Sequence, residues 1–253
     1  MRTKLFDYEY IFAGQTDIGA RREYNQDEVI LAPDMGLFGV SDGMGGLDFG
    51  GLSSAYVKEA MPALVENGIP FLTGSDEKQV AKLLEEYVRT MSDKLFFQGN
   101  TYSYFRYGAT FVGVLLFGKK AIFVNLGDSR AYLLPKHKRD PIQITEDMNV
   151  AALLIKNGEM TKEQAAKSNA SSTLISFVGM QAPALPDSFI VDVKPGDRIL
   201  LCSDGLYGMV PEREIAMLMR SGKSPKRVCE RLIASANQHG GRDNISAVYI
   251  YIR

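Results

Sequence analysis

The feature of this sequence that most constrains its fold is a series of short apolar runs joined by very short connections. Residues 110–117, 121–126 and 130–134 follow one another with three residues between neighbours. A parallel crossover needs a dozen or more residues, so connections of this length predict antiparallel hairpins. These runs therefore predict two successive hairpins in the middle of the chain.

Other segments complete an α+β pattern. Further strand-like runs occupy residues 10–16, 28–31, 36–41, 188–193, 198–203 and 247–252. Apolar residues recur at three- and four-residue intervals in 52–66 and 76–97, which predicts helices, and 149–157, 161–168, 211–220 and 224–238 also have a helical pattern. Strands grouped into hairpins and helices grouped in pairs predict antiparallel sheets packed together with helices outside. Without a repeat or a linker, residues 1–253 are predicted to form one domain, in which 146–172 are an appended subdomain.

Net charge and the lengths of the apolar stretches indicate which classes of partner the chain is not expected to bind. Lys and Arg number 29 and Asp and Glu number 30, which gives a formal net charge of −1. Such a chain lacks the excess of positive charge that binds nucleic acid irrespective of sequence, so we expect no nucleic-acid partner. The longest apolar stretch, residues 110–118, is shorter than the about 20 residues that a membrane span needs. We therefore expect no membrane insertion.

The few cysteines and histidines bear on location and on metal type. Cys202 and Cys229 lie in a strand-like run and a helix-like segment, which predicts no disulfide framework and fits a cytoplasmic protein. The N-terminal residues contain acidic side chains and no long apolar core, unlike a secretory signal. With two Cys and two His, a closed structural zinc site is not expected.

Carboxylates stand where several of the predicted strands end. Apolar runs lead directly into Asp42-Gly43, Asp128-Ser129 and Asp204-Gly205, and Asp243 comes just before the final strand. Strand ends are rigid enough to hold a ligand in place, and hard cations such as Mg²⁺ and Mn²⁺ prefer oxygen ligands. A cluster of carboxylates without a cation would raise the pKa of its own members by repulsion. Taken singly, each Asp also fits an ordinary turn.

These residues resemble the metal-dependent protein serine/threonine phosphatases of the type 2C (PPM) family, in their compact bacterial form. The resemblance covers most of the chain, and its order and spacing make it specific. The matching segments are TDIG at 16–19, REYNQD at 22–27, SDGMGG at 41–46, GAT at 108–110, GDSR at 127–130, SDGL at 203–206 and DNIS at 243–246.

The resemblance implies a fold and a metal centre. The fold would be a four-layer αββα sandwich, two antiparallel β-sheets flanked by helix pairs, with residues 146–172 as a small flap subdomain. Asp42 would bridge two metal ions, with the Gly43 carbonyl on the second ion. Asp204 and Asp243 would complete the first site, and Asp128 resembles the ligand of a third, weaker ion.

The resemblance also implies a reaction. Two Mn²⁺ or Mg²⁺ ions would activate a bridging water that attacks phosphorus directly. Arg22 resembles the arginine that grips the substrate phosphate, and Asp27 resembles the carboxylate that orients the waters on the ions. The implied partners are phosphorylated proteins, the substrates of a serine/threonine kinase, and we expect the phosphatase to act as a monomer. Two local alternatives stay open: a bare hairpin turn at Asp128-Ser129-Arg130, and a solvated basic pair at Arg21 and Arg22.

Three positions depart from the family pattern. Met44 stands where many eukaryotic members carry a histidine proposed as general acid, so we assign no protein acid, and simple packing would also explain Met44. Gly208 stands where some members carry an acid for the third ion. Met148-Asn149 replaces the usual His-Ser at the entry to the flap, so substrate preference cannot be carried over.

Three functions are therefore compared. The first is a phosphoserine/phosphothreonine phosphatase, which retains all the core carboxylates. The second is a non-enzymatic relative that uses the fold for binding. The third is a metal-dependent hydrolase of a small phosphorylated molecule, since a metal centre recognises only the phosphate group.

Overall fold

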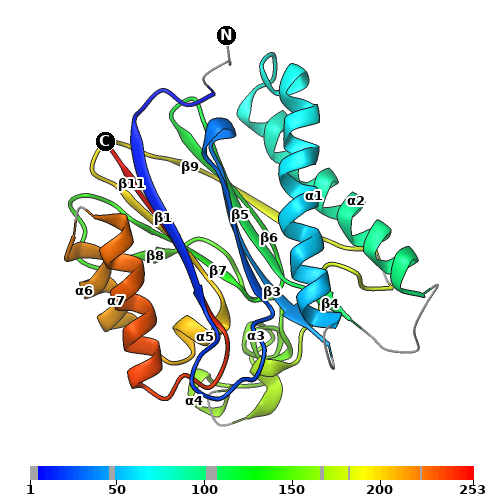
Figure 1. The fold of residues 1–253 in the computed structure, drawn as a ribbon, viewed down its shortest axis with the longest axis vertical. Helices are drawn as coiled ribbons and strands as arrows, with labels where there is room; N and C mark the ends of the chain where they lie inside the picture. The colour runs from blue at the N-terminus through cyan, green and yellow to red at the C-terminus, as the bar shows by residue number, and fades with distance from the viewer. Residues whose placement is uncertain (1–4, 46–48, 101–106, 166–167, 182, 223) are drawn as a thin grey trace.

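The computed structural model describes residues 5–45, 49–100, 107–165, 168–181, 183–222 and 224–253, and it shows two sheets with paired helices outside (Figure 1). The strands are β1 (Tyr10–Asp17), β2 (Asp27–Ala32), β3 (Leu37–Met44), β4 (Gly108–Ala109), β5 (Phe111–Phe117), β6 (Lys120–Leu126), β7 (Arg130–Leu134), β8 (Ile142–Gln143), β9 (Asp187–Asp192), β10 (Arg198–Cys202) and β11 (Ile245–Ile252). The helices are α1 (Phe49–Leu72), α2 (Glu77–Asn100), α3 (Val150–Lys156), α4 (Lys162–Ala165), α5 (Asp204–Tyr207), α6 (Glu212–Arg220) and α7 (Pro225–Gln238).

The strands form two antiparallel sheets. One has the order β1-β11-β10-β7-β8 and the other the order β2-β3-β5-β6-β9, with β4 paired to β3. The first and last strands are neighbours, because β1 pairs with β11 along its whole length, from Tyr10 opposite Ile252 to Asp17 opposite Ile245.

Three apolar clusters separate four layers. Helices α1 and α2 cover the sheet that contains β3 and β5, while α6 and α7 cover the sheet that contains β10 and β11 (Figure 1). The third cluster fills the space between the two sheets; among its members are Phe38, Val114, Phe123, Leu201 and Val248. The observed architecture confirms the predicted αββα sandwich.

Strand β5 shows why the central runs are continuously apolar. Phe111 and Leu115 pack under the helices α1 and α2, whereas Val112 and Val114 face the other sheet. Successive side chains of a strand point to opposite faces, so a strand covered on both faces must be apolar at every position.

One of the predicted hairpins is wrong. Strand β5 pairs with β6 as expected, but β6 and β7 belong to different sheets. Residues 127–129 instead carry the chain across the sandwich, since three residues can span about the 10 Å that separates stacked sheets. Gly127 has a φ of 120°, and a Cβ there would lie 2.7 Å from the Cβ of Thr110. The crossing therefore requires glycine, and the bare hairpin turn proposed at Asp128 does not occur.

The segment 146–172 lies within the connection from β8 to β9 and contains α3 and α4. In Figure 1 these two helices and α5 lie at one end of the sandwich, opposite the chain termini. Asn149 caps α3, because its side-chain oxygen accepts a hydrogen bond from the backbone N–H of Ala152. We refer to residues 146–172 as the flap.

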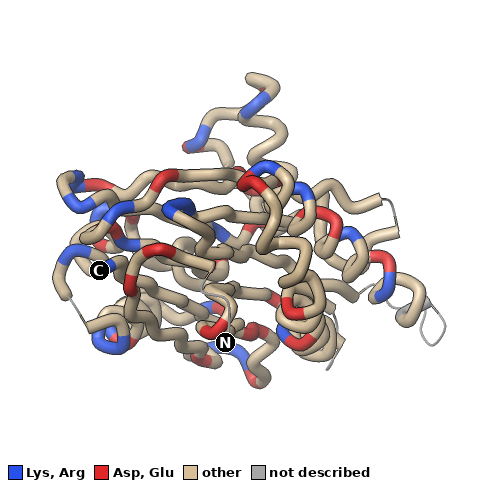
Figure 2. Tube along the Cα trace, turned by 90° about the horizontal axis from the view of Figure 1, so that it is seen from above, with Lys and Arg blue, Asp and Glu red and all other residues tan. Residues whose placement is uncertain are grey.

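Both signs of charge are distributed over the surface. Figure 2 shows Lys and Arg positions scattered among Asp and Glu positions along the trace. Within the described part of the chain, none of the helices has the length and apolar character needed to cross a membrane.

Candidate metal centre

Asp42, one of the predicted metal ligands, lies near the end of β3. Its backbone N–H donates to the hydroxyl of Thr110 at 3.1 Å, and its carbonyl accepts from the N–H of Thr110 at 2.8 Å. Asp27, the first residue of β2, is its cross-strand partner. Two of the predicted acids are thus placed side by side by the β2–β3 pairing.

Asp204 reaches the same place from the other sheet. It is the first residue of α5, the short helix that follows β10 and that the sequence pattern did not predict. Its side chain is in hydrogen-bonding contact with that of Asp42. The hydroxyl of the preceding residue, Ser203, donates to Asp27 Oδ2 at 2.7 Å. The ends of β3 and β10 therefore bring three carboxylates together, those of Asp27, Asp42 and Asp204. We call these three residues and the nearby Asp243 the acid group.

Asp243 and Arg22 close the group on the solvent side. Arg22 Nη2 contacts Asp243 Oδ2 at 2.6 Å, and the two side chains are 51% and 34% exposed. The hydrogen bond to Asp243, aided by the charges of Asp42 and Asp204, raises the pKa of Arg22. Arg22 is thus bonded to the acid group, and it is not half of a solvated basic pair with Arg21.

Asn244 fixes the loop that carries Arg22, a role that the sequence analysis missed. Its side-chain amide donates to the carbonyls of Ile18 and Tyr24, both at 2.9 Å, and its oxygen accepts from the N–H of Gln26 at 2.9 Å. A buried asparagine next to a predicted ligand could have suggested such a role, but its three partners lie more than 200 residues away in the sequence.

Two glycines allow the backbones to approach closely. A Cβ on Gly43 would collide with the carbonyl oxygen of Gly50, and one on Gly205 would collide with the carbonyl oxygen of Asn244. The glycine after each of two central aspartates is therefore required by packing. The Gly43 carbonyl lies in the segment of β3 that pairs with β4.

The acids of this group are buried, and burial shifts their protonation. Burial raises the pKa of Asp42 well above its usual value, and the charges of Asp27 and Asp204 raise it further. Burial likewise raises the pKa of Asp27 to about 7 and that of Asp204 to about 6. Without additional positive charge these carboxyls resist full ionisation.

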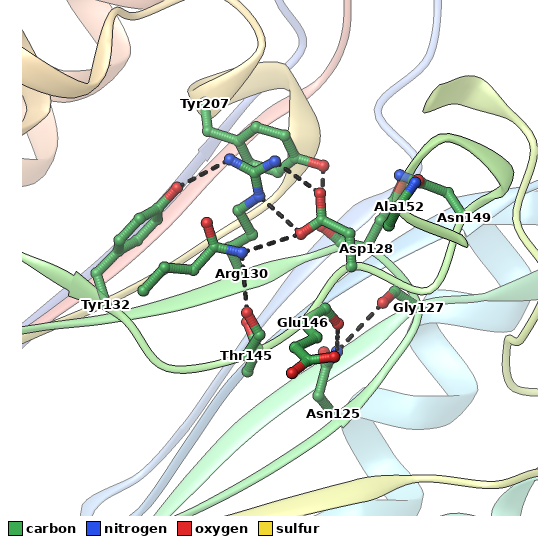
Figure 3. Close-up of polar contacts among 12 residues, drawn as sticks. Asn125, Gly127, Asp128, Arg130, Tyr132, Thr145, Glu146, Asn149, Ala152 and Tyr207 are labelled. Atoms are coloured by element: carbon green, nitrogen blue, oxygen red, sulfur yellow. Dashed lines mark hydrogen bonds and ion pairs between the residues drawn. The ribbon is translucent and has the colours of Figure 1, made fainter. Parts of the chain in front are cut away.

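Asp128 lies at the sheet crossing, beside the start of the flap (Figure 3). Its carboxylate accepts a hydrogen bond from Asn149 Nδ2 at 3.4 Å, and its carbonyl accepts one from the Tyr207 hydroxyl at 2.9 Å. Burial raises the pKa of Asp128 to about 7, and the nearby charge of Asp204 contributes. Asp128 is therefore electrostatically part of the acid group.

The two departures near these acids have simple local geometry. Gly208 ends α5, where its N–H donates to the Asp204 carbonyl at 2.7 Å. Met44 is the last residue of β3 and pairs with Gly108.

The donor set fits a hard divalent cation. Oδ1 of Asp27 and Oδ1 of Asp204 are buried without a hydrogen-bond partner, an arrangement that is costly unless a cation or water satisfies the oxygen. Over the described residues, no three His, Cys, Asp or Glu side chains already form a ready-made ion site. The acids thus form a loose group in which Asp42 touches Asp204, while Arg22 holds an oxygen of Asp243.

Comparisons with known proteins find serine/threonine phosphatases that match nearly the whole chain. The serine/threonine phosphatase stp of Listeria monocytogenes serotype 4b is 29% identical over 93% of this chain and 93% of its own. The structure of the S. agalactiae serine/threonine phosphatase aligns with a TM-score of 0.83 and 26% identity, over 97% of this chain and all of that one. The catalytic domain of the phosphatase PstP, solved with two manganese ions, aligns with a TM-score of 0.79 and 27% identity, over 96% and 98%.

A family model provides the assignment. The model described as "Protein phosphatase 2C" matches residues 19–246, a span that includes all the acids described above. The chain therefore belongs to the protein phosphatase 2C family.

Proposed function

We propose that this chain hydrolyses phosphoserine and phosphothreonine in proteins, with two divalent ions, Mn²⁺ or Mg²⁺, held by the acid group. The observation that carries the proposal is the convergence of Asp27, Asp42 and Asp204 at the ends of strands from both sheets. Asp27 is buried and lies opposite Asp42 across β2 and β3, and the side chains of Asp42 and Asp204 are in hydrogen-bonding contact. The names of the relatives and the manganese-containing neighbour support the same function.

The chain's own donors suggest how the ions would be held. Asp42 lies between Asp27 of its own sheet and Asp204 of the other sheet, and it would contact both ions. The Gly43 carbonyl would hold one ion, and Asp204 and Asp243 would hold the other. The unpartnered Oδ1 of Asp204 favours this role, because it has no competing hydrogen bond. Asp128 would hold a third, weaker ion. When bound, such ions supply an activated water and offset the charge of the phosphate.

Arg22 is suited to hold the substrate phosphate. Its side chain is half exposed at the rim of the acid group, and its guanidinium offers several donors in one plane. A phosphate that takes over this guanidinium would release Asp243 Oδ2 for the ions. Substrate binding and ligand arrangement would then be coupled through one side chain.

Asp27 is suited to orient water rather than to bind the phosphate. It is buried at the start of β2, and one oxygen is held by the Ser203 hydroxyl. Its other oxygen, Oδ1, has no partner and can accept a hydrogen bond from a water in the acid group.

Several wider expectations accompany this function. We propose one catalytic domain over residues 1–253 with the flap at 146–172, because the two sheets share one interior cluster. The substrates would be products of a serine/threonine kinase, and the phosphatase would act as a monomer. Both cysteines are buried and neither forms a disulfide, which supports a cytoplasmic location.

The direct test is hydrolysis of a phosphothreonine peptide and of p-nitrophenyl phosphate by the purified protein with Mn²⁺. We expect turnover of both, abolished by a chelator and by Asp42→Ala, whereas Asp140→Ala in the exposed β7–β8 loop serves as the matched control. Absence of turnover with any divalent ion would favour a binding module. Turnover of small esters but of no phosphopeptide would favour a small-molecule hydrolase.

A further inference from the structure

A partly buried ion pair lies next to the acid group but has no part in the roles above. Arg130 Nε and Nη2 donate to the two carboxylate oxygens of Asp147 at 2.8 and 2.6 Å, and the side chains are 20% and 12% exposed. The guanidinium carbon lies 3.6 Å from the centre of the Tyr207 ring (Figure 3). We call Arg130, Asp147 and Tyr207 the arginine clamp.

The clamp is geometrically specific. Burial opposes the positive charge of Arg130, but the hydrogen bonds to Asp147, together with the charge of Asp147 and the nearby tyrosines, raise the pKa of the guanidinium. Two parallel hydrogen bonds and a ring contact fix a planar guanidinium in one orientation. A lysine ammonium could supply the charge but not this shape.

The clamp joins three segments that carry function. Arg130 follows Asp128 by two residues, Tyr207 lies in the helix that begins with Asp204, and Asp147 is the second residue of the flap. The Tyr207 hydroxyl donates to the Asp128 carbonyl at 2.9 Å. The clamp thus contacts the backbone of one acid directly and the flap through an ion pair.

Three further hydrogen bonds of the flap's first residues lead to the same stretch of chain. The N–H of Met148 donates to the Gly127 carbonyl at 3.0 Å, and Asn125 Nδ2 donates to the Glu146 carbonyl at 3.2 Å. Asn149, the cap of α3, donates to the Asp128 carboxylate. The first four residues of the flap are therefore bonded to residues 125–130, which include the sheet crossing.

We propose that the arginine clamp is a positioning device that fixes the flap relative to the acid group and thereby controls how a phosphorylated protein approaches. The inference rests on the proposed function. A small ester would need only the acid group and Arg22, whereas a longer protein segment bound there would also lie near the flap, because Asn149 of the flap bonds the Asp128 carboxylate. Loosening the clamp should therefore affect protein substrates more than small ones.

The test compares Arg130→Lys and Tyr207→Phe with the unchanged protein. Arg130→Lys keeps the charge but loses the two-pronged contact, so amide hydrogen exchange in Met148 and α3 should rise about tenfold. KM for a phosphothreonine peptide should rise severalfold, while kcat for p-nitrophenyl phosphate should stay within about twofold. Tyr207→Phe keeps the ring and loses the hydrogen bond to Asp128, so we expect the same changes at smaller size.

Tyr132→Phe is the matched control. The Tyr132 hydroxyl accepts from Arg130 Nη1 at 3.2 Å, yet it touches neither Asp128 nor the flap's first residues. Its removal should leave the amide exchange rates of Met148 and α3 unchanged within about twofold. KM for the phosphothreonine peptide and kcat for p-nitrophenyl phosphate should stay within the same limit. Exchange in α1 serves as an internal reference for global unfolding.

Two results would overturn the proposal. One is unchanged flap exchange in Arg130→Lys, which would make the ion pair purely structural. The other is an equal loss for peptide and small ester, which would place the effect in the acid group itself. Hydrogen exchange does not depend on turnover, so a protein without phosphatase activity would refute the proposed function while still reporting on the clamp.

Discussion

The acid group and the arginine clamp are neighbouring clusters that differ in how the negative charge of their carboxylates is balanced. In the clamp, Asp147 has a buried cation of its own, Arg130, held at two points. In the acid group, Asp27 is buried beside the partly buried Asp42 and Asp204, and the neighbouring cation, Arg22, is half exposed and bonded to Asp243. The clamp is electrostatically complete within the chain, whereas the acid group needs positive charge from outside.

The largest expected difference is in the pH dependence of stability without metal. Folded Asp27 and Asp128 have pKa values of about 7 and Asp204 of about 6, all above the about 4 of an unfolded Asp. Between about pH 4 and 7 the unfolded chain releases protons that the folded chain retains, so stability is lost as the pH rises. Each such acid contributes about 1.4 kcal/mol per pH unit in this window.

Urea unfolding in a chelator, measured from pH 4.5 to 7.5, tests this dependence. Added Mn²⁺ should flatten the profile, because bound cations favour the ionised carboxylates. A chelated protein whose stability rises through this window would show that the acids have sufficient positive charge within the chain.

Breaking the clamp should have the next largest effect. Asp147→Ala leaves Arg130 buried without its partner, so the free energy of unfolding should fall by about 3–5 kcal/mol. The exposed pair of Arg89 with Glu86 is the control, since Glu86→Ala should cost less than about 1 kcal/mol. Chemical denaturation of both variants measures the difference. Equal costs would mean that burial gives the clamp no special strength.

Removing a charge from the acid group should act in the opposite direction on stability. Asp204→Asn should make the chelated protein about 1–3 kcal/mol more stable at pH 7.5, because a buried like charge is lost. Turnover should nevertheless fall at least about a hundredfold, more than for a residue that only supports a ligand. Paired denaturation and kinetic measurements check both parts. Lower stability together with retained turnover would contradict the assignment of Asp204.

The smallest expected effect concerns Arg22. Arg22→Lys retains the charge but loses the planar fork, so kcat/KM should fall about tenfold. Its stability should change by less than about 1 kcal/mol, because its contact with Asp243 is partly exposed. The neighbouring variant Arg21→Lys provides the comparison and should leave kinetics unchanged. Equal effects of the two variants would support a general basic surface rather than a phosphate contact.

The sequence was most informative where strands end in aspartate. The apolar runs before Asp42 and Asp204 predicted rigid strand ends, and the structure places both side chains in contact. Periodicity also predicted the main helices, although α1 extends to Phe49–Leu72, beyond the predicted 52–66. Local pattern is sufficient here because burial on one face or both determines which residues a strand or helix can contain.

The sequence was least informative where contacts join distant segments. A three-residue link cannot distinguish a hairpin from a crossing between stacked sheets, so the partners of β7 were mispredicted. Neither the three hydrogen bonds of Asn244 nor the clamp of Arg130 and Asp147 follows from periodicity. The partner of Asp147, Arg130, lies 17 residues earlier in β7, too far for a local pattern to reveal.

The pairing of β1 with β11 has a consequence for biosynthesis. Arg22 stands in the loop after β1, and that loop is held by Asn244, which the ribosome adds 222 residues after Arg22. A nascent chain that has not yet released its final strand lacks both Asp243 and the residue that seats Arg22. The loop that carries Arg22 would therefore be seated only after Asn244 has left the ribosome, however early β1 is synthesised.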